Sequence, residues 1–256
     1  MTNGADITVT AGRVATIEMC RPPNNYLDVT LIEGIAQALR QLAADGDCRA
    51  VVLCSQGKHF CAGADFRSRD GGLGSGRPGS HLYDHALALF EQPLPIVAAV
   101  QGGAIGGGLG LALAADFRIG SPESRFSANF ARLGFHHGFG LTVTLPAVIG
   151  QQRALEMLYT GSGIGGEEAT QIGLCDRLVP LADLRSVATD VANQIALSAP
   201  LAVRSIRQTM RGDLPDAVLS ALMRERNEQD RLMQMHDWTE GVKAMAVRRQ
   251  PSFLGR

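Results

Sequence analysis

Two uninterrupted apolar runs constrain the fold of this chain more than any other feature. Ala50–Cys54 and Ile96–Val100 have the composition of strands that are covered on both faces. The second run leads through a glycine-rich turn into an apolar helix that we predict over Ile105–Ala115. The same order of strand, turn and helix recurs more weakly from Asp116 through Arg125–Ser127. Strands that alternate with crossover helices predict an α/β fold.

The two ends of the chain differ in character. Near the start, two short strands at Ile7–Thr10 and Arg13–Met19 precede an amphipathic helix that begins at Asp28. The last third contains only helical patterns. We therefore predict a core over residues 1–190 that carries the functional site, and a C-terminal helical region over residues 191–256 that serves oligomerisation.

Prolines and one capping signal indicate where the helices of the last third begin and end. Asp237 and Glu240 have the spacing of a capping box, so we expect them to start the final helix. The methionines of this region are interpreted as core or subunit-interface residues. The predicted helices cover Leu181–Ala199, Ala202–Arg211, Pro215–Met235 and Asp237–Arg248.

Charge and cysteine content exclude several classes of protein. The chain has 24 basic and 25 acidic residues, so its net charge of −1 gives no electrostatic case for a nucleic-acid partner or an anionic membrane. A hydrophobic fraction of 45% is too high for a disordered chain. Five cysteines without a CxxC pair favour free thiols in a reducing cytoplasm.

One stretch is long enough to be mistaken for a membrane span. Residues 92–115 form a stretch of 24 residues without a charge, which is long enough for a transmembrane helix. The stretch holds six glycines and two prolines, however, and lacks flanking aromatic belts. A buried strand followed by a buried helix explains this composition better, so we expect no membrane segment here.

A pair of histidines raises the question of a metal site. His81 and His85 are separated by one helical turn, with Asp84 between them. No further ligand follows at a fixed spacing, so we interpret the pair as part of a partly solvated helix face and predict no metal.

Glycine is concentrated in one part of the chain. The sequence has 30 glycines, and 13 of them lie between Gly57 and Gly110. The segment Gly102–Gly110 fails the dinucleotide fingerprint, and a GxGxxG at residues 74–79 follows no strand. A P-loop and a GxSxG nucleophile elbow are both absent from the sequence. The common nucleotide and hydrolase motifs therefore do not account for the glycines.

Two glycine-flanked turns remain, at residues 60–65 and 106–108. Each follows a predicted buried strand, and the second opens a helix. Backbone N–H groups from two such turns can converge on one anionic oxygen, and the helix N-terminus adds partial positive charge. This arrangement is typical of an oxyanion hole that stabilises an enolate or a tetrahedral intermediate.

The motifs around these turns identify a family. Lys58–Asp65 reads KHFCAGAD, and Val100–Gly108 reads VQGGAIGGG. With Ala115–Ile119, Gly161–Pro180 and Pro251–Arg256, this pattern resembles the enoyl-CoA hydratase/isomerase (crotonase) superfamily nearly from end to end. The resemblance implies a spiral of ββα units with a C-terminal helical region. It also implies trimers, often paired into hexamers, that act on acyl-CoA in fatty acid metabolism without another cofactor.

The resemblance also assigns site residues. The backbone N–H groups of Ala64 and Gly107 would form the oxyanion hole for the thioester carbonyl. The turn formed by Cys61, Ala62, Ala64 and Asp65 would line the path of coenzyme A. We expect the thiol of Cys61 to permit close cofactor approach rather than to act as a nucleophile. The glycine-rich insert at residues 71–79 falls beside the acyl pocket, where a lid is one interpretation.

The sequence departs from the family pattern at the two positions that matter for hydration. The resemblance places catalytic glutamates at Gly110 and Phe130, and no Asp or Glu stands between Arg125 and Leu141. Because glycine and phenylalanine transfer no protons, we do not expect the two-glutamate mechanism. His136 and His137 follow on the same segment and are candidates for acid or base.

Two hypotheses follow. In the first, the chain is an enzyme that stabilises a thioester enolate or oxyanion, in a proton shift, a retro-Claisen cleavage or a thioester hydrolysis. In the second, it is a non-catalytic acyl-CoA-binding protein that kept the oxyanion hole. The two turns favour both hypotheses equally. The histidine pair favours the first, which we prefer, whereas Gly110 and Phe130 favour the second.

Overall fold

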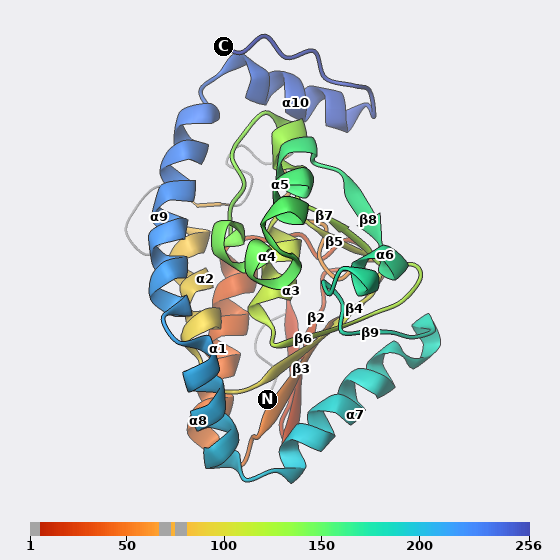
Figure 1. The fold of residues 1–256 in the computed structure, drawn as a ribbon, viewed down its shortest axis with the longest axis vertical. Coiled ribbons are helices and arrows are strands. Elements are labelled where there is room, and N and C mark those ends of the chain that lie inside the picture. Colours follow the sequence, from red (N-terminus) through yellow and green to blue (C-terminus); the bar gives the residue numbers. More distant parts are fainter. Residues whose placement is uncertain (1–5, 67–72, 75–80) are drawn as a thin grey trace.

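The computed structural model of the chain describes residues 6–66, 73, 74 and 81–256 (Figure 1). Its main sheet has six strands in the order β1-β2-β3-β4-β6-β9. β1 is antiparallel to β2, and the other neighbours are parallel. The predicted α/β class is therefore confirmed. The strands are β1 (Ile7–Thr10), β2 (Val14–Met19), β3 (Ala50–Ser55), β4 (Ile96–Val100), β6 (Phe117–Gly120) and β9 (Arg177–Leu178).

A second, three-stranded sheet has the order β5-β7-β8, formed by β5 (Gly103–Ile105), β7 (Arg125–Ser127) and β8 (Gly163–Gly165). The expected helix start at Ile105 is wrong, because Ile105 pairs with Ser127 at the end of β5. The helix α3 (Gly107–Ala114) begins only after Gly106, whose φ of 55° turns the chain. That left-handed conformation favours glycine.

The helices cover both faces of the main sheet. The first begins where predicted, since the Asp28 side chain accepts a hydrogen bond from Leu31 N at 2.8 Å, and it ends at Gly46 in the left-handed region. The helices are α1 (Val29–Asp45), α2 (Leu82–Glu91), α3, α4 (Leu141–Ile149), α5 (Gln151–Thr160), α6 (Gly166–Gln171), α7 (Leu184–Leu197), α8 (Pro200–Arg211), α9 (Leu214–Leu232) and α10 (His236–Ala246), with 3-10 turns η1 (Asn129–Leu133) and η2 (Leu181–Asp183).

The surroundings of β3 explain why its residues Ala50–Cys54 are all apolar. Val51 and Leu53 belong to the large core that α1 and α2 cover. Val52 and Cys54 belong to a second core on the opposite face, closed by α7 residues such as Ala188. Figure 1 shows α7 on one side of the sheet and α1 on the other. Burial on both faces is what the continuous apolar run predicts.

The C-terminal region differs in detail from the prediction. The expected boundary at residue 190 falls inside α7, which packs on β3 and β4 of the main sheet. The predicted capping box at Asp237 and Glu240 is wrong. Asp237 accepts hydrogen bonds from the N–H groups of Leu254 and Gly255, and Glu240 accepts one from Ser252 N and pairs with Arg249. Both carboxylates hold the C-terminal tail instead.

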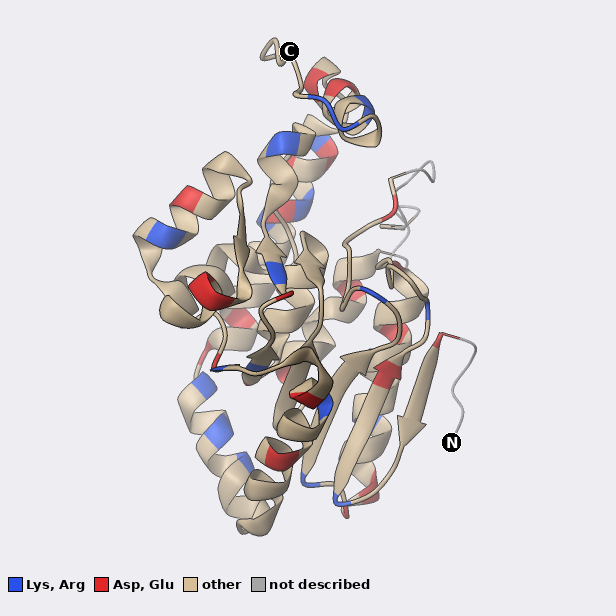
Figure 2. Ribbon diagram, turned by 90° about the vertical axis from the view of Figure 1, so that its right-hand side faces the viewer, with Lys and Arg blue, Asp and Glu red and all other residues tan. Residues whose placement is uncertain are grey.

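The uncharged stretch at residues 92–115 forms β4, β5 and α3 and does not make one long helix. Among the described residues, no helix combines the length and the apolar character needed to cross a membrane. Figure 2 shows acidic and basic residues spread over the helices and loops of the visible side.

One buried ion cluster attaches α8 to the sheet. Asp116 precedes β6 and accepts hydrogen bonds from Ile96 N and from the guanidinium groups of Arg207 and Arg211. The Asp116 and Arg207 side chains are only 17% and 9% exposed. Removing one partner from a buried pair leaves an uncompensated charge in a poorly solvated place.

We therefore predict that Asp116→Asn lowers the free energy of unfolding by about 3 kcal/mol, the usual cost of breaking a buried ion pair. Urea unfolding followed by circular dichroism measures this change. Glu156→Gln is the control, because its pair with Arg153 is more than half exposed, and it should cost no more than about 0.5 kcal/mol. Equal effects of the two substitutions would contradict this account.

Candidate active site

The two predicted glycine turns lie directly against each other. Cys61 N donates to Gly103 O at 3.0 Å, and Ile105 N donates to Cys61 O at 3.0 Å. A side chain on Gly108 would collide with the Cys61 carbonyl oxygen, so the approach is possible only between bare backbones. The first turn is thereby joined to the strand that leads into α3.

Both turns present backbone N–H groups that have no acceptor among the described residues. Gly107 is the first residue of α3, where an N–H has no partner inside the helix. Ala64 forms a parallel bridge with Leu27, and Leu27 N donates to Gly63 O. Because successive amides of an extended segment point to opposite sides, the Ala64 amide is turned away from Leu27. No described residue accepts a hydrogen bond from the N–H of Ala64 or Gly107.

Ala62, Ala64 and Gly107 line one small cavity of about 60 Å³. The rest of its wall is mainly apolar and aromatic. Among the described lining residues, only Tyr83 and Asn129 carry polar side-chain groups, and none is Asp, Glu or His. The described lining residues are Leu27, Ala62, Gly63, Ala64, Phe66, Leu82, Tyr83, Gly106, Gly107, Asn129, Phe130, Leu133, Phe139 and Met245.

Neither position at which the family resemblance places a glutamate offers a carboxylate: Phe130 lines the cavity, and Gly110 lies behind Phe139, which lines it. A Cβ on Gly110 would lie 2.6 Å from the Cβ of Phe139, so the Phe139 side chain fills the space beside Gly110. Phe139 is fully buried and has a positive φ of 62°. Phe130 lines the cavity itself and packs against Phe135. Aromatic rings therefore stand where acid–base groups were expected.

The other residues of the first turn have different surroundings. Cys61 is completely buried, and burial raises the pKa of its thiol to about 12, so the thiol stays protonated at neutral pH. Asp65 is half-buried at the end of the turn and does not belong to the cavity wall. The structure therefore brings Ala62 and Ala64 to the cavity, but not Cys61 or Asp65.

His136 and His137 do not line the cavity. Their rings stack on each other with centroids 4.1 Å apart. His137 Nε2 lies 2.9 Å from Thr142 Oγ1, and that hydroxyl donates to Glu225 of α9 at 2.7 Å. Glu225 is fully buried and also accepts from Gly140 N at 2.8 Å, at the start of α4. The histidines thus belong to a polar cluster that holds α4 against α9.

A tyrosine that the sequence did not single out connects this cluster to the cavity. Tyr83 lines the cavity, and its hydroxyl donates to Gln229 Oε1 at 2.9 Å. Gln229 Nε2 donates in turn to the carbonyl of His136. The Tyr83 hydroxyl fills the space that a side chain on Gly138 would need. Tyr83 and Gly138 are far apart in the sequence, so no sequence pattern indicates that Tyr83 belongs to the site.

The histidine pair on α2 has a structural role at His81. This residue is buried as the N-cap of α2, where its Nδ1 accepts from Tyr83 N and Asp84 completes a capping box. The expectation of a partly solvated face is therefore wrong for His81. No group of three possible metal ligands occurs among the described residues.

Of the insert at residues 71–79, only Leu73 and Gly74 belong to the described residues. Leu73 is buried, and its carbonyl accepts from Leu82 N at 2.8 Å. The interpretation of the insert as a lid otherwise falls outside the described residues.

Comparison with known proteins identifies the family of the chain. The family model described as enoyl-CoA hydratase/isomerase matches residues 10–256. An enoyl-CoA isomerase/hydratase of Mycosarcoma maydis is 34% identical over 212 residues, covering 81% of this chain and 77% of the relative. A carnitinyl-CoA dehydratase of Proteus mirabilis is 31% identical over 253 residues, covering 96% of this chain and 97% of the relative.

A solved structure shows the same fold. The enoyl-CoA hydratase/isomerase of Pseudoalteromonas atlantica superposes with a TM-score of 0.89 at 29% identity, covering 97% of this chain and 100% of that one. The chain therefore belongs to the enoyl-CoA hydratase/isomerase (crotonase) family and has the crotonase fold, with its C-terminal helices.

Two histidines of the site region provide a pH test. Burial is the main reason that the pKa values of His81 and His137 fall to about 4, with Arg226 and His136, respectively, adding to the effect. Unfolded histidines titrate near 6.5, so the unfolded chain binds more protons between about pH 6.5 and 4. The folded state therefore loses stability as the pH falls through this window.

We predict that His137→Gln makes this loss shallower by up to about 1.4 kcal/mol per pH unit, because one group with a lowered pKa has been removed. Urea unfolding at a series of pH values measures the slope. His236→Gln is the control and should change the slope much less, because this side chain is half-exposed and its pair with Asp237 is screened by solvent. Parallel curves for His137→Gln and the natural protein would contradict the prediction.

Proposed function

We propose that the chain is an acyl-CoA enzyme that stabilises the enolate of a thioester by a route other than the two-glutamate hydration mechanism. The backbone N–H groups of Ala64 and Gly107 would bind the thioester oxygen. One observation carries this proposal. Two N–H groups without a described acceptor belong to the wall of one small cavity, and no described side chain in that wall is a carboxylate.

The physical basis is charge on the thioester oxygen. When a proton or a carbon group leaves the α-carbon, negative charge moves onto that oxygen. Preorganised N–H donors in an apolar cavity stabilise this charge more than water does, and the N-terminus of α3 adds partial positive charge. A proton shift, a retro-Claisen cleavage and a thioester hydrolysis all use such stabilisation. Hydration through two glutamates lacks its acid and base at Gly110 and Phe130.

Coenzyme A would lie along the turn that holds Cys61, Ala62, Ala64 and Asp65, and no further cofactor is needed for this chemistry. The acyl-CoA relatives support the choice of substrate class, because a carnitinyl-CoA dehydratase aligns over nearly the whole chain. We also propose a role in fatty acid metabolism within the cytoplasm, which the five free thiols support.

Proton transfer requires an acid or a base, and none of the described cavity-lining residues is Asp, Glu or His. We keep His136 and His137 as the candidate acid or base, although neither lines the cavity. This arrangement favours the alternative function, a non-catalytic acyl-CoA-binding protein. The same experiment distinguishes the two.

Gly107→Pro is the sharpest test, because proline removes one N–H and is well tolerated as the first residue of a helix. Gly107→Ala is the matched control, since it adds a side chain but keeps the N–H. Each protein is incubated with saturated acyl-CoAs in D₂O, and deuterium at the α-carbon is measured by mass spectrometry. We expect exchange with the natural protein and with Gly107→Ala, and a loss of roughly 100-fold with Gly107→Pro.

Tight binding of acyl-CoA without exchange or product would support the non-catalytic alternative. Circular dichroism would first establish that both variants are folded. Equal exchange by Gly107→Pro and Gly107→Ala would then contradict a role of the Gly107 N–H in catalysis. Exchange that survives His136→Ala and His137→Ala would exclude both histidines as the base.

We also propose that the chain forms a homotrimer or hexamer. Helix α8 supports this, because none of its apolar residues is buried although the helix is strongly amphipathic. Leu201, Ile206 and Met210 are 78%, 62% and 80% exposed. Apolar side chains gathered in this way are typical of a surface that another subunit covers.

Light scattering should therefore give three or six times the chain mass of 27.2 kDa. Ile206→Asp places a charge on the apolar face of α8 and should shift the mass toward that of the monomer. Gln208→Asp adds the same charge at an exposed polar position and should leave the mass unchanged. A monomeric natural protein would contradict the proposal.

A further inference from the structure

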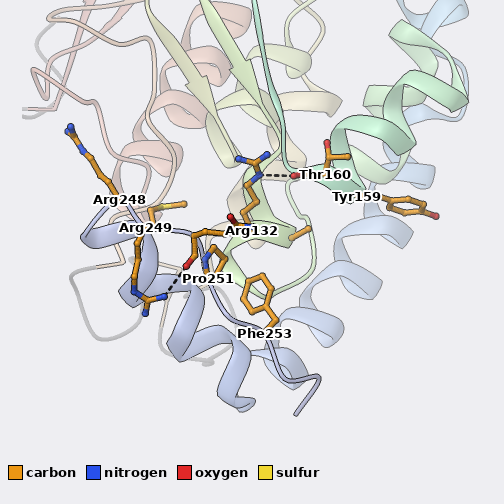
Figure 3. A pocket seen from close by; sticks show the side chains of 10 residues that line it. Arg132, Tyr159, Thr160, Arg248, Arg249, Pro251 and Phe253 are labelled. Carbon is orange, nitrogen blue, oxygen red and sulfur yellow. Dashed lines mark hydrogen bonds between the residues drawn. The ribbon is translucent and has the colours of Figure 1, made fainter.

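A second, larger hollow lies beside the cavity of the candidate site. This groove has a volume of about 850 Å³ and runs between the C-terminal tail and the segments η1 and α5. Figure 3 shows Pro251 and Phe253 of the tail near Arg132, which is bound to Thr160. The groove is open to solvent, whereas the neighbouring cavity holds little more than a short acyl segment.

The groove and the cavity are neighbours with a shared wall. Met245 of α10 lines both of them. In η1, Asn129 and Phe130 line the cavity, and the next two residues, Ala131 and Arg132, line the groove. An acyl chain that extends from the cavity past Met245 would therefore enter the groove at its distal end. The Met245 side chain is flexible and can adjust its conformation to a bound acyl chain.

The groove has an excess of positive charge. Its described lining includes three arginines and no aspartate or glutamate. Arg249 is already paired with both oxygens of Glu240. Arg132 and Arg248 have no carboxylate partner among the described residues, and Figure 3 shows Arg248 directed away from the labelled group around Arg132. Arg132 is thus the cation best placed for a ligand in the groove.

Two contacts hold the Arg132 side chain in position. Its Nε donates to Thr160 O at 2.7 Å, at the C-terminal end of α5. Its stem passes over Gly161, where a Cβ would lie 2.8 Å from the Arg132 Cγ. The two terminal nitrogens of the guanidinium make no hydrogen bond to a described residue. A planar donor with a fixed stem and unused N–H groups suits a carboxylate.

We propose that the groove receives an anionic group at the distal end of the acyl chain, and that Arg132 binds it. The substrate class is then an acyl-CoA with a terminal carboxylate, such as a dicarboxylic acid monothioester. This inference rests on the proposed function, because it assumes that the thioester lies at Ala64 and Gly107.

The test compares two ligands that differ only in the terminal group, glutaryl-CoA and pentanoyl-CoA. Calorimetry measures the affinity of each for the full-length protein, at low and high salt. We expect glutaryl-CoA to bind at least about tenfold tighter, because hydrogen bonds between a guanidinium and a carboxylate are charge-assisted and stronger than neutral ones. The preference should shrink with salt, because the groove is open to solvent.

Arg132→Gln should abolish this preference while leaving pentanoyl-CoA affinity unchanged, and Arg132→Lys should restore part of it. Arg153→Gln is the control, since Arg153 is an exposed arginine of α5 outside the groove. Equal affinity of the natural protein for the two thioesters would overturn this inference alone. Failure to bind either thioester would overturn the proposed function as well.

A further outcome would assign Arg132 to the phosphates of coenzyme A. In that case Arg132→Gln would weaken both CoA thioesters equally and would not affect the corresponding pantetheine thioesters, which lack those phosphates. That result would overturn the inference. A preference for the glutaryl group that persists with pantetheine thioesters would support it.

Discussion

The contact between two bare backbone turns is the constraint on which the rest of the site depends. Gly108 lies so close to the carbonyl of Cys61 that no side chain fits between them. This approach joins the turn after β3 to the strand β5 and fixes where α3 begins. The N–H groups of Ala64 and Gly107 come to one cavity because the two turns are held together. The glycines near residue 107 therefore serve backbone packing as much as conformational freedom.

The chemistry of the cavity depends on the two N–H donors in its wall and on the absence of Asp, Glu and His among its described lining residues. Phe139 fills the space beside Gly110, and Phe130 forms part of the wall, so the cavity is aromatic at both positions where the family resemblance places a carboxylate. An apolar wall strengthens the electrostatic effect of two N–H donors, but it supplies no base. Of the polar groups around the cavity, the Tyr83 hydroxyl is bound to Gln229, and the two histidines belong to the cluster around Glu225 and do not line the wall.

Short sequence patterns predicted those features of the fold that depend on residues close together in the sequence. The apolar run at Ala50–Cys54 predicted a strand buried on both faces, and Asp28 predicted the start of α1. The glycine turns predicted where backbone would meet backbone. The error at Ile105 has the same origin, since an apolar residue beside a glycine turn fits the end of a strand as well as the start of a helix.

Contacts between distant segments were beyond prediction. Asp237 and Glu240 have the spacing of a helix cap, but they bind the tail that follows the same helix. Nothing near Tyr83 in the sequence indicates that its hydroxyl lies beside Gly138. Likewise, Glu225 reaches the start of α4 from α9, so the surroundings of His137 depend on a helix far along the chain.

The central claim is that the amides of Ala64 and Gly107 bind the oxygen of an acyl-CoA thioester. Infrared difference spectroscopy of a ¹³C-labelled thioester carbonyl tests this claim directly, because hydrogen bonds to the oxygen weaken the C=O bond. The account predicts that the carbonyl band moves to lower frequency on binding, and that Gly107→Pro reduces this shift while Gly107→Ala preserves it. A bound thioester whose carbonyl band stays at its position in water would contradict the account.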